Sequence, residues 1–184
     1  RIGGARLAMR LKAELPEIAP DHVIDLKQAR HPLLILGKTV ETVVPNDFTL
    51  GGDTRTMIIT GPNTGGKTVA LKTMGLMALM HQAGFQLPVA SGSSLAVFTA
   101  VFADIGDAQS IDRSVSTFSS HMGRVIEILE LADTGSLILL DELGTGTDPE
   151  EGSALARAIL SKLVREGIPV AVTTHHRAVA EFAG

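Results

Sequence analysis

The segment GPNTGGKT (61–68) holds the residues of the chain best suited to bind phosphate. It fits the pattern G-x-x-x-x-G-K-[ST] and lies between an apolar run typical of a strand and a segment expected to form a helix. There, glycines let the backbone point its N–H groups inward, Lys67 brings a charge to the β- and γ-phosphates, and Thr68 offers a hydroxyl to Mg²⁺. A glycine-rich turn with a surface lysine is the alternative. The predicted cofactor-binding residues are Gly61, Pro62, Asn63, Thr64, Gly65, Gly66, Lys67, Thr68 and Val69.

Two consecutive carboxylates follow a second apolar run, LILL (137–140). Ligands bind at the carboxyl ends of strands in open parallel sheets, which is where Asp141 and Glu142 would then lie. We expect Asp141 to hold Mg²⁺, directly or through water, and Glu142 to orient and deprotonate an attacking water. A strand that runs into a solvated acidic turn is the alternative. One carboxylate suffices to hold a metal, so the second favours hydrolysis over binding alone.

A histidine follows the last apolar run, IPVAVTT (168–174). We expect His175 at the same sheet edge, where its ring can hydrogen-bond a γ-phosphate or the attacking water. A purely structural role for this histidine stays open. Together with Lys67 and Glu142 it completes the set of predicted catalytic residues.

Hydroxyl side chains crowd the segment SVSTFSS (114–120), just before a helical pattern. Capping of the helix N-terminus explains one or two of them and contact with an anion explains the others, so both roles stay open for Ser114, Ser116 and Thr117. Further along, GTGTDPEEG (144–152) ends as a helix start, with Asp148 as N-cap. We assign the preceding loop, 144–148, an interface role only.

The elements that must position these residues predict an α/β fold. Apolar runs of strand length alternate with helices, which indicates a mostly parallel sheet with helices on both faces. Before them, short β-branched runs and a helical pattern closed by Pro16 predict a small antiparallel N-terminal sheet and a leading helix. The expected strands are 23–24, 39–40, 42–44, 57–60, 96–105, 137–141 and 168–174, and the expected helices are 5–15, 67–83, 120–132 and 149–165.

Composition narrows the class of protein further. The 184 residues are 45% hydrophobic and carry a formal charge of -4, so the chain can build a core but lacks the basic balance of a typical nucleic-acid binder. It contains no cysteine, and no apolar stretch approaches the roughly 20 residues of a membrane span. We expect a cytoplasmic protein with no membrane partner. The chain opens in mid-pattern without Met, which predicts a piece of a longer protein.

The segments GPNTGGKT, DIGDAQSIDRSVSTFSSHM, LILLDELGTGTDP and TTHH, in this order and after QARHPLL, resemble the ATPase domain of the MutS family. Within the family, SIDRSVSTFSSHM and ELGTGTDPEEG are most similar to the type-two bacterial branch. The resemblance covers residues 22–184. It implies a P-loop NTPase of ABC type over those residues, preceded by a connector helix over 1–21.

The resemblance also implies a homodimer in which two copies meet head to tail around two ATP or ADP molecules, each with Mg²⁺. Asn63 and Lys67 would contact the phosphates, Thr68 and Asp141 would serve the metal, and Glu142 would activate water. All of these implied contacts lie within one copy.

Other contacts implied by the resemblance reach toward the partner copy. The hydroxyls of 114–117 would act in trans on the partner's γ-phosphate, which accounts for their surplus, and the loop 144–148 would pass between the two sites. His175 would be the switch histidine.

The sequence departs from the family pattern at one place. Mismatch-repair members stack an aromatic residue on adenine, whereas the corresponding stretch here, TVVPND (42–47), offers only a valine.

Type-two members of the family are associated with branched DNA, suppression of homologous recombination and rescue of collided ribosomes, and they usually carry a C-terminal Smr nuclease domain. Contacts with DNA or with a ribosome, and any endonuclease activity, would belong to other domains of the parent protein. Two alternatives stay open: an ATPase of mismatch repair or chromosome maintenance, and a nucleotide-gated dimerisation switch with little hydrolysis. Glu142 argues against the switch.

Overall fold

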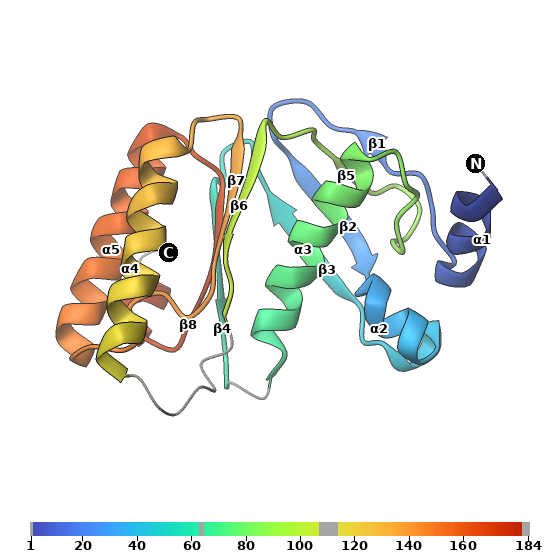
Figure 1. Ribbon diagram of the computed structural model, residues 1–184. Coiled ribbons are helices and arrows are strands. Elements are labelled where there is room, and N and C mark those ends of the chain that lie inside the picture. The colour runs from blue at the N-terminus through green and yellow to red at the C-terminus, as the bar shows by residue number, and fades with distance from the viewer. Residues whose placement is uncertain (1, 63–64, 107–113, 182–184) are drawn as a thin grey trace. The chain divides into compact units, whose positions relative to one another are not determined.

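The computed structural model describes residues 2–62, 65–106 and 114–181 (Figure 1). The chain forms two compact units, each with its own sheet. The parallel-sheet unit comprises Arg55–Leu71 and Thr99–Gly184, and the mixed-sheet unit comprises Arg1–Thr54 and Lys72–Phe98. All the site residues predicted from the sequence belong to the parallel-sheet unit.

Four parallel strands build the sheet of the parallel-sheet unit, in the order β4-β8-β7-β6. Every residue of β7 and β8 is buried, as expected for the two central strands of a parallel sheet. The α/β class and the parallel sheet predicted from the sequence are therefore confirmed. The strands are β4 (Thr56–Thr60), β6 (Ala100–Asp104), β7 (Ser136–Leu140) and β8 (Val170–Thr174).

The helices that follow these strands are α4 (Ser114–Leu131), α5 (Pro149–Glu166) and α6 (Arg177–Ala180). Figure 1 shows α4 and α5 side by side against one face of the sheet. Val125 of α4 and Leu160 of α5 pack there with Ile138 of β7 in one apolar core. Leu137 and Leu139 alternate with Ile138, so they point to the opposite face, and they are also buried. Both faces of β7 are thus shielded from water.

The mixed-sheet unit has a second sheet, in the order β1-β5-β2-β3. β2 pairs antiparallel with β3, as predicted for this part of the chain, and also with β5, a strand that was not predicted, whereas β1 pairs parallel with β5. The expected antiparallel sheet is therefore mixed, because β5 arrives from far along the chain and no hairpin sets its direction against β1. The elements are α1 (Ile2–Leu11), β1 (Glu17–Ile18), β2 (Ile24–Ala29), α2 (Pro32–Gly37), η1 (Val40–Thr42), β3 (Asn46–Leu50) and β5 (Ser94–Leu95). The helix α3 (Lys67–Gln82) begins in the parallel-sheet unit and belongs to the mixed-sheet unit from Lys72 on.

The strands expected at 39–40 and 42–44 are wrong. Val40–Thr42 forms a 3₁₀ turn, in which the Thr42 hydroxyl donates to the carbonyl of Thr39 at 2.9 Å and accepts from its N–H at 3.3 Å. β-branched residues are frequent in strands, but a threonine can also bond locally to the backbone and close a turn. Local side-chain bonding therefore overrides the strand propensity of this segment.

Two helix boundaries also differ from the sequence-based expectation. α1 ends at Leu11 rather than residue 15, because Lys12 has a φ of +49° and Ala13 donates its N–H back to Ala8 at 2.9 Å. α4 begins at Ser114 rather than near 120. Within the described residues, none of the helices is long and apolar enough to cross a membrane.

Candidate functional site

Three of the predicted features follow neighbouring strands at one edge of the parallel sheet. Thr60, the last residue of β4, is paired with Thr174 at the end of β8, and Leu140 at the end of β7 is paired with Val172. The phosphate loop (61–68) follows β4, His175 follows β8, and the acidic pair (Asp141 and Glu142) follows β7. Because β8 separates β4 from β7 and neighbouring strands lie about 5 Å apart, the phosphate loop and the acidic pair leave the sheet about 10 Å from each other.

The phosphate loop joins β4 to α3 through two glycines in the left-handed region, Gly61 with φ +137° and Gly66 with φ +80°. Only glycine adopts these angles readily, which is the physical reason for their place in the pattern. Between them, Gly65 donates its N–H to the carbonyl of Pro62 at 2.9 Å. Asn63 and Thr64 lie outside the described residues.

Lys67 opens α3, and its side chain turns back toward the loop. It is only 5% exposed, and its Nζ donates to the carbonyl of Gly61 at 2.6 Å. An ammonium carries three N–H donors, so this bond does not exclude a phosphate contact. Thr68 is half-buried and Val69 is exposed, both in the first turn of the helix.

The backbone bends directly after β7, at the acidic pair. Asp141 is 5% exposed and donates its N–H to the carbonyl of Asp104, the last residue of β6, at 2.9 Å. Glu142 is half-buried and has a φ of +50°, a left-handed conformation that is uncommon outside glycine. On the neighbouring strand, the Thr173 hydroxyl donates to Asp141 Oδ1 at 2.5 Å and accepts the Glu142 N–H at 2.7 Å. The sequence analysis did not single out Thr173, because threonine is ordinary in a strand.

The oxygen donors at this edge fit Mg²⁺. A buried carboxylate on Asp141 and a hydroxyl on Thr68 are hard ligands, and Mg²⁺ is usually held by one or two protein groups together with water and substrate phosphates. Among the described residues no cluster of three or more His, Cys, Asp or Glu could hold a metal by itself. The site thus fits a metal that arrives with a nucleotide, and does not resemble an all-protein metal cage.

His175 is exposed at the end of β8, next to His176. The two rings stack with centroids 4.4 Å apart, and His176 Nε2 lies 3.2 Å from the carbonyl of Gly144. His176 therefore ties the end of β8 to the loop 144–148, a contact that the sequence analysis missed. The adjacent histidines were visible in the sequence, but nothing there indicates which ring faces the loop.

The loop 144–148 is packed closely on the helix it precedes. The predicted cap is confirmed, since Asp148 accepts the N–H groups of Glu150 and Glu151 at 2.9 and 3.3 Å. A Cβ added at Gly152 would lie 2.0 Å from the carbonyl oxygen of Gly144. Only glycine allows this approach of loop and helix.

The serine-rich segment lies in the first turn of α4, although the side chains of Ser114, Ser116 and Thr117 are outside what the structure describes. From His121 on, the helix is fixed to the sheet. The Asp104 carboxylate is 2% exposed, forms an ion pair with His121 and accepts from Arg124 Nε at 2.9 Å. Asp104 is a third residue missed from the sequence, where a single acidic residue at a strand end gave no signal.

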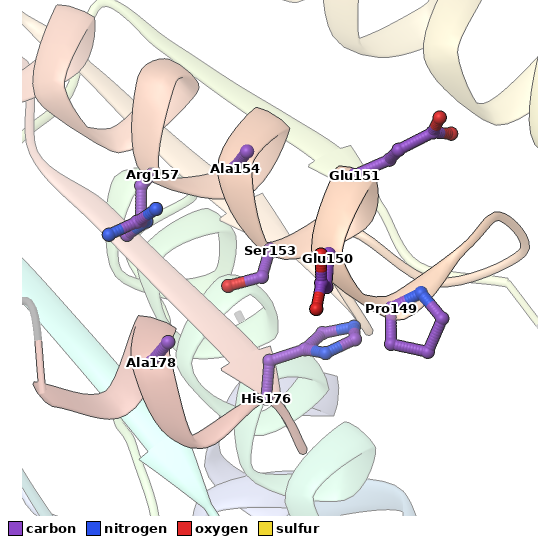
Figure 2. Close-up of a pocket in the computed structure, with 8 residues that line it drawn as sticks. All are labelled: Pro149, Glu150, Glu151, Ser153, Ala154, Arg157, His176 and Ala178. Carbon is purple, nitrogen blue, oxygen red and sulfur yellow. The ribbon is translucent and has the colours of Figure 1, made fainter.

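A pocket of about 710 Å³ lies beside the start of α5 and includes none of the predicted site residues (Figure 2). Figure 2 shows the Glu150 carboxylate and the His176 ring at its centre. The phosphate loop and the acidic pair do not line it. His176, which follows His175 after β8, is the lining residue nearest in sequence to the edge described above. Its lining residues are Pro149, Glu150, Glu151, Ser153, Ala154, Arg157, His176 and Ala178.

The chain is similar to known proteins along most of its length. The family model described as MutS domain V matches residues 57–183. The Endonuclease MutS2 of Geobacillus kaustophilus is 55% identical over 172 residues, 94% of the chain, and that of Bacillus cereus (strain Q1) is 54% identical over 169 residues, 92% of the chain. That of Lactobacillus helveticus is 52% identical over 172 residues, 94% of the chain. The chain spans about a fifth, 21%, of the length of each relative.

Proposed function

The chain belongs to the MutS family, and from its similarity to MutS2 proteins we propose that it is the ATP-hydrolysing module of that branch, a P-loop NTPase of ABC type. The observation that carries the proposal is the convergence of the phosphate loop, the acidic pair and His175 on three neighbouring strand ends. Ligands bind at that edge in open parallel sheets.

In this proposal the loop 61–69 binds the phosphates of ATP or ADP. The left-handed glycines turn backbone N–H groups toward the ligand, and the positive end of the α3 dipole adds to their attraction. Asn63 and Lys67 contact the β- and γ-phosphates. The half-buried Thr68 and the exposed Val69 complete the first turn of the binding helix.

Catalysis is assigned to the residues that leave β7 and β8. Mg²⁺, when bound, neutralises charge that develops on the transferred phosphoryl group. Asp141 and Thr68 supply oxygen atoms to hold it. Glu142 orients the attacking water and accepts its proton, and His175 donates a hydrogen bond to the γ-phosphate or to the water.

We further propose that the full site is shared between two copies of the chain. The hydroxyls of Ser114, Ser116 and Thr117 reach the γ-phosphate held by the other copy, and the loop 144–148 runs between the sites. In support, α4 includes all three residues in its first described turn, so they lie close together on one element. Without the other domains of the parent protein the dimer should be weak, so the chain by itself should be mostly monomeric. Each site then lacks the contacts that the partner supplies, and ATP hydrolysis should be slow.

The outputs of the parent protein belong to the same proposal. Residues 1–21, which include the helix α1, form a connector and 22–184 the ATPase domain, coupled to other domains that bind branched DNA and possess any endonuclease activity. A ribosome or its RNA is a further proposed target of those domains. The similar proteins are named endonucleases, and the chain covers about a fifth of their length, 21%.

The test is phosphate release from ATP and Mg²⁺ over a wide range of protein concentrations, for the wild-type chain and Glu142→Gln. We expect a specific activity that rises with protein concentration. The variant should keep nucleotide binding, accumulate ATP-bound dimers and lose about a hundredfold or more in rate, which is the usual contribution of a general base.

The matched control is Glu130→Gln, the same change at an exposed position near the other end of α4, which should leave the rate as it is. A rate that does not depend on protein concentration would contradict the shared site. If wild type and Glu142→Gln both bind ATP and neither releases phosphate at any concentration, the module is a nucleotide-gated switch.

A further inference from the structure

Thr173 joins the two acidic residues through a single buried hydroxyl. Its side chain is 0% exposed, on the strand that lies between β4 and β7. The hydroxyl donates to Asp141 Oδ1 at 2.5 Å and accepts the N–H of Glu142 at 2.7 Å. The carbonyl of the same residue accepts the N–H of Leu143 at 3.1 Å. One residue of β8 therefore holds three successive residues after β7.

Chemistry fixes the direction of each bond in this group. A backbone N–H can only donate, so the hydroxyl oxygen must accept from Glu142, and the single hydroxyl proton is left to point at Asp141. The bond to Asp141 is then a hydrogen bond to a carboxylate, which is short and strong. A carboxylate has two oxygens, so Oδ2 can take a metal ion while Oδ1 accepts from Thr173.

The backbone of Glu142 needs such support. Its φ of +50° is unfavourable for a residue with a Cβ and persists only where surrounding bonds hold it. Bonds from its own N–H and from the next N–H both end on Thr173, and Thr145 donates to its carbonyl at 3.1 Å. The direction in which the Glu142 side chain leaves the sheet thus depends on β8.

We propose that Thr173 is a positioning residue whose hydroxyl orients Asp141 toward Mg²⁺ and holds the turn that aims Glu142 at the attacking water. This inference rests on the proposed ATPase function, which assigns those roles to the two carboxylates. Thr173 touches neither nucleotide nor water, and acts through Asp141 and Glu142. It lies two residues before His175, so one strand end supports the acidic pair and presents the histidine.

The test compares Thr173→Val, which keeps the shape and removes the hydroxyl, with Thr173→Ser, which keeps the hydroxyl. For Thr173→Val we expect kcat to fall about tenfold or more, because a hydrogen bond to a charged group is lost, with KM for ATP nearly unchanged. A second readout needs no turnover: the Mg²⁺ concentration that half-saturates binding of a fluorescent ATP analogue should rise by a similar factor. Thr173→Ser should restore both.

The matched control is Thr56→Val at the other end of β4, where the hydroxyl is buried and has no hydrogen-bond partner among the described residues. Equal kcat and Mg²⁺ values for Thr173→Val and Thr56→Val would overturn the proposal, as would a loss that Thr173→Ser does not repair. If the wild-type chain binds nucleotide but releases no phosphate, the proposed hydrolysis fails, and the Mg²⁺ shift alone decides the role of Thr173. A wild-type chain that binds no nucleotide would overturn both inferences.

Discussion

Two aspartates close neighbouring strands of the parallel sheet, and their surroundings differ. Asp104 is 2% exposed and Asp141 is 5% exposed, so both carboxylates have lost most of their water. Asp104 meets two basic side chains, His121 and Arg124. Among the described residues, Asp141 meets neutral donors only, chiefly the Thr173 hydroxyl. A buried charge without an ionic partner is costly, and such groups are typical of sites that bind a cation. This contrast is consistent with a structural role for Asp104 and with the metal-binding role that we propose for Asp141.

Replacing each of the two aspartates with asparagine should therefore have opposite effects. Asp104→Asn should lower the free energy of unfolding by about 1–3 kcal/mol, since two basic groups lose their partner, and should leave Mg²⁺-dependent nucleotide binding unchanged. Asp141→Asn should leave stability unchanged or slightly higher and weaken that binding about tenfold or more. Urea denaturation and a titration with a fluorescent ATP analogue measure the two quantities.

Each variant is the control for the other, because the chemical change is identical and both positions lie at the ends of paired strands. If Asp104→Asn weakened nucleotide binding as much as Asp141→Asn, the proposed difference in role between the two aspartates would be wrong.

At the scale of elements, the loop 144–148 depends on a contact between two glycines. Gly144 has a φ of +88°, and the carbonyl oxygen of Gly152 would lie 2.5 Å from a Cβ added to it. The reverse approach, at Gly152, is closer still at 2.0 Å. The loop, its Asp148 cap and the first turn of α5 consequently form one piece. His176 adds a bond from the end of β8 to the same loop.

Gly152→Ala should break this piece. The added methyl group meets backbone rather than a flexible side chain, so either loop or helix must move, at a cost of about 1–3 kcal/mol. Gly123→Ala is the matched control, because Gly123 is inside α4 and has nothing within 4 Å of its added Cβ. That change should raise stability by about 0.5–1 kcal/mol, the usual gain for alanine in a helix. Thermal unfolding of both variants measures the difference, and two shifts of the same sign would contradict the packing argument.

Most elements of the parallel-sheet unit could be predicted from the sequence, because apolar runs and capping residues mark them directly. The start of α5 is the clearest example, with Asp148 and Pro149 in their expected places. The mixed-sheet unit was harder to predict. Its residues 39–44 look like strand, but their hydroxyls close a turn instead, and the short helix α2 starts at Pro32 within an apolar run that gives no helical period.

The candidate site shows the same division between local and non-local information. The phosphate loop and the acidic pair are continuous segments whose chemistry can be recognised from residue type and order. The residues that were missed act through distant partners. Thr173 and His176 each bond to a residue 32 positions away, and Asp104 contacts basic side chains on α4 about 20 positions away. No local pattern marks such residues, since their roles come from strand order and register.

At the scale of the whole molecule, two histidines of the mixed-sheet unit make stability depend on pH. The mixed-sheet unit contains His31 and His81, both partly buried. Burial lowers the pKa of each, and the charge of Lys72 lowers the pKa of His31 further. The folded state thus resists protonation of these rings, whereas the unfolded chain takes up protons near the ordinary value of about 6.5. Stability from the two histidines is present above that pH and is lost as the pH falls through it.

The unfolding temperature should accordingly decrease between pH 7.5 and 5.5, and the double variant His31→Gln, His81→Gln should show a smaller decrease. Because the substitutions also alter packing, the slope against pH is the quantity to compare, and not the absolute temperature. Calorimetry at several pH values and a constant ionic strength measures this slope. Equal slopes for wild type and variant would show that acid acts through other groups.

The close packing of the loop 144–148 also has a consequence for spectroscopy. A Cβ at Gly146 would lie 3.4 Å from Phe118 Cβ, so the loop passes directly over a ring in the first turns of α4. The chain contains six phenylalanines and neither tryptophan nor tyrosine, so its intrinsic fluorescence is very weak. Phe118→Trp would therefore give the protein a single strong emitter. Its emission wavelength would report how closely the loop 144–148 packs over this position of α4, without any attached dye.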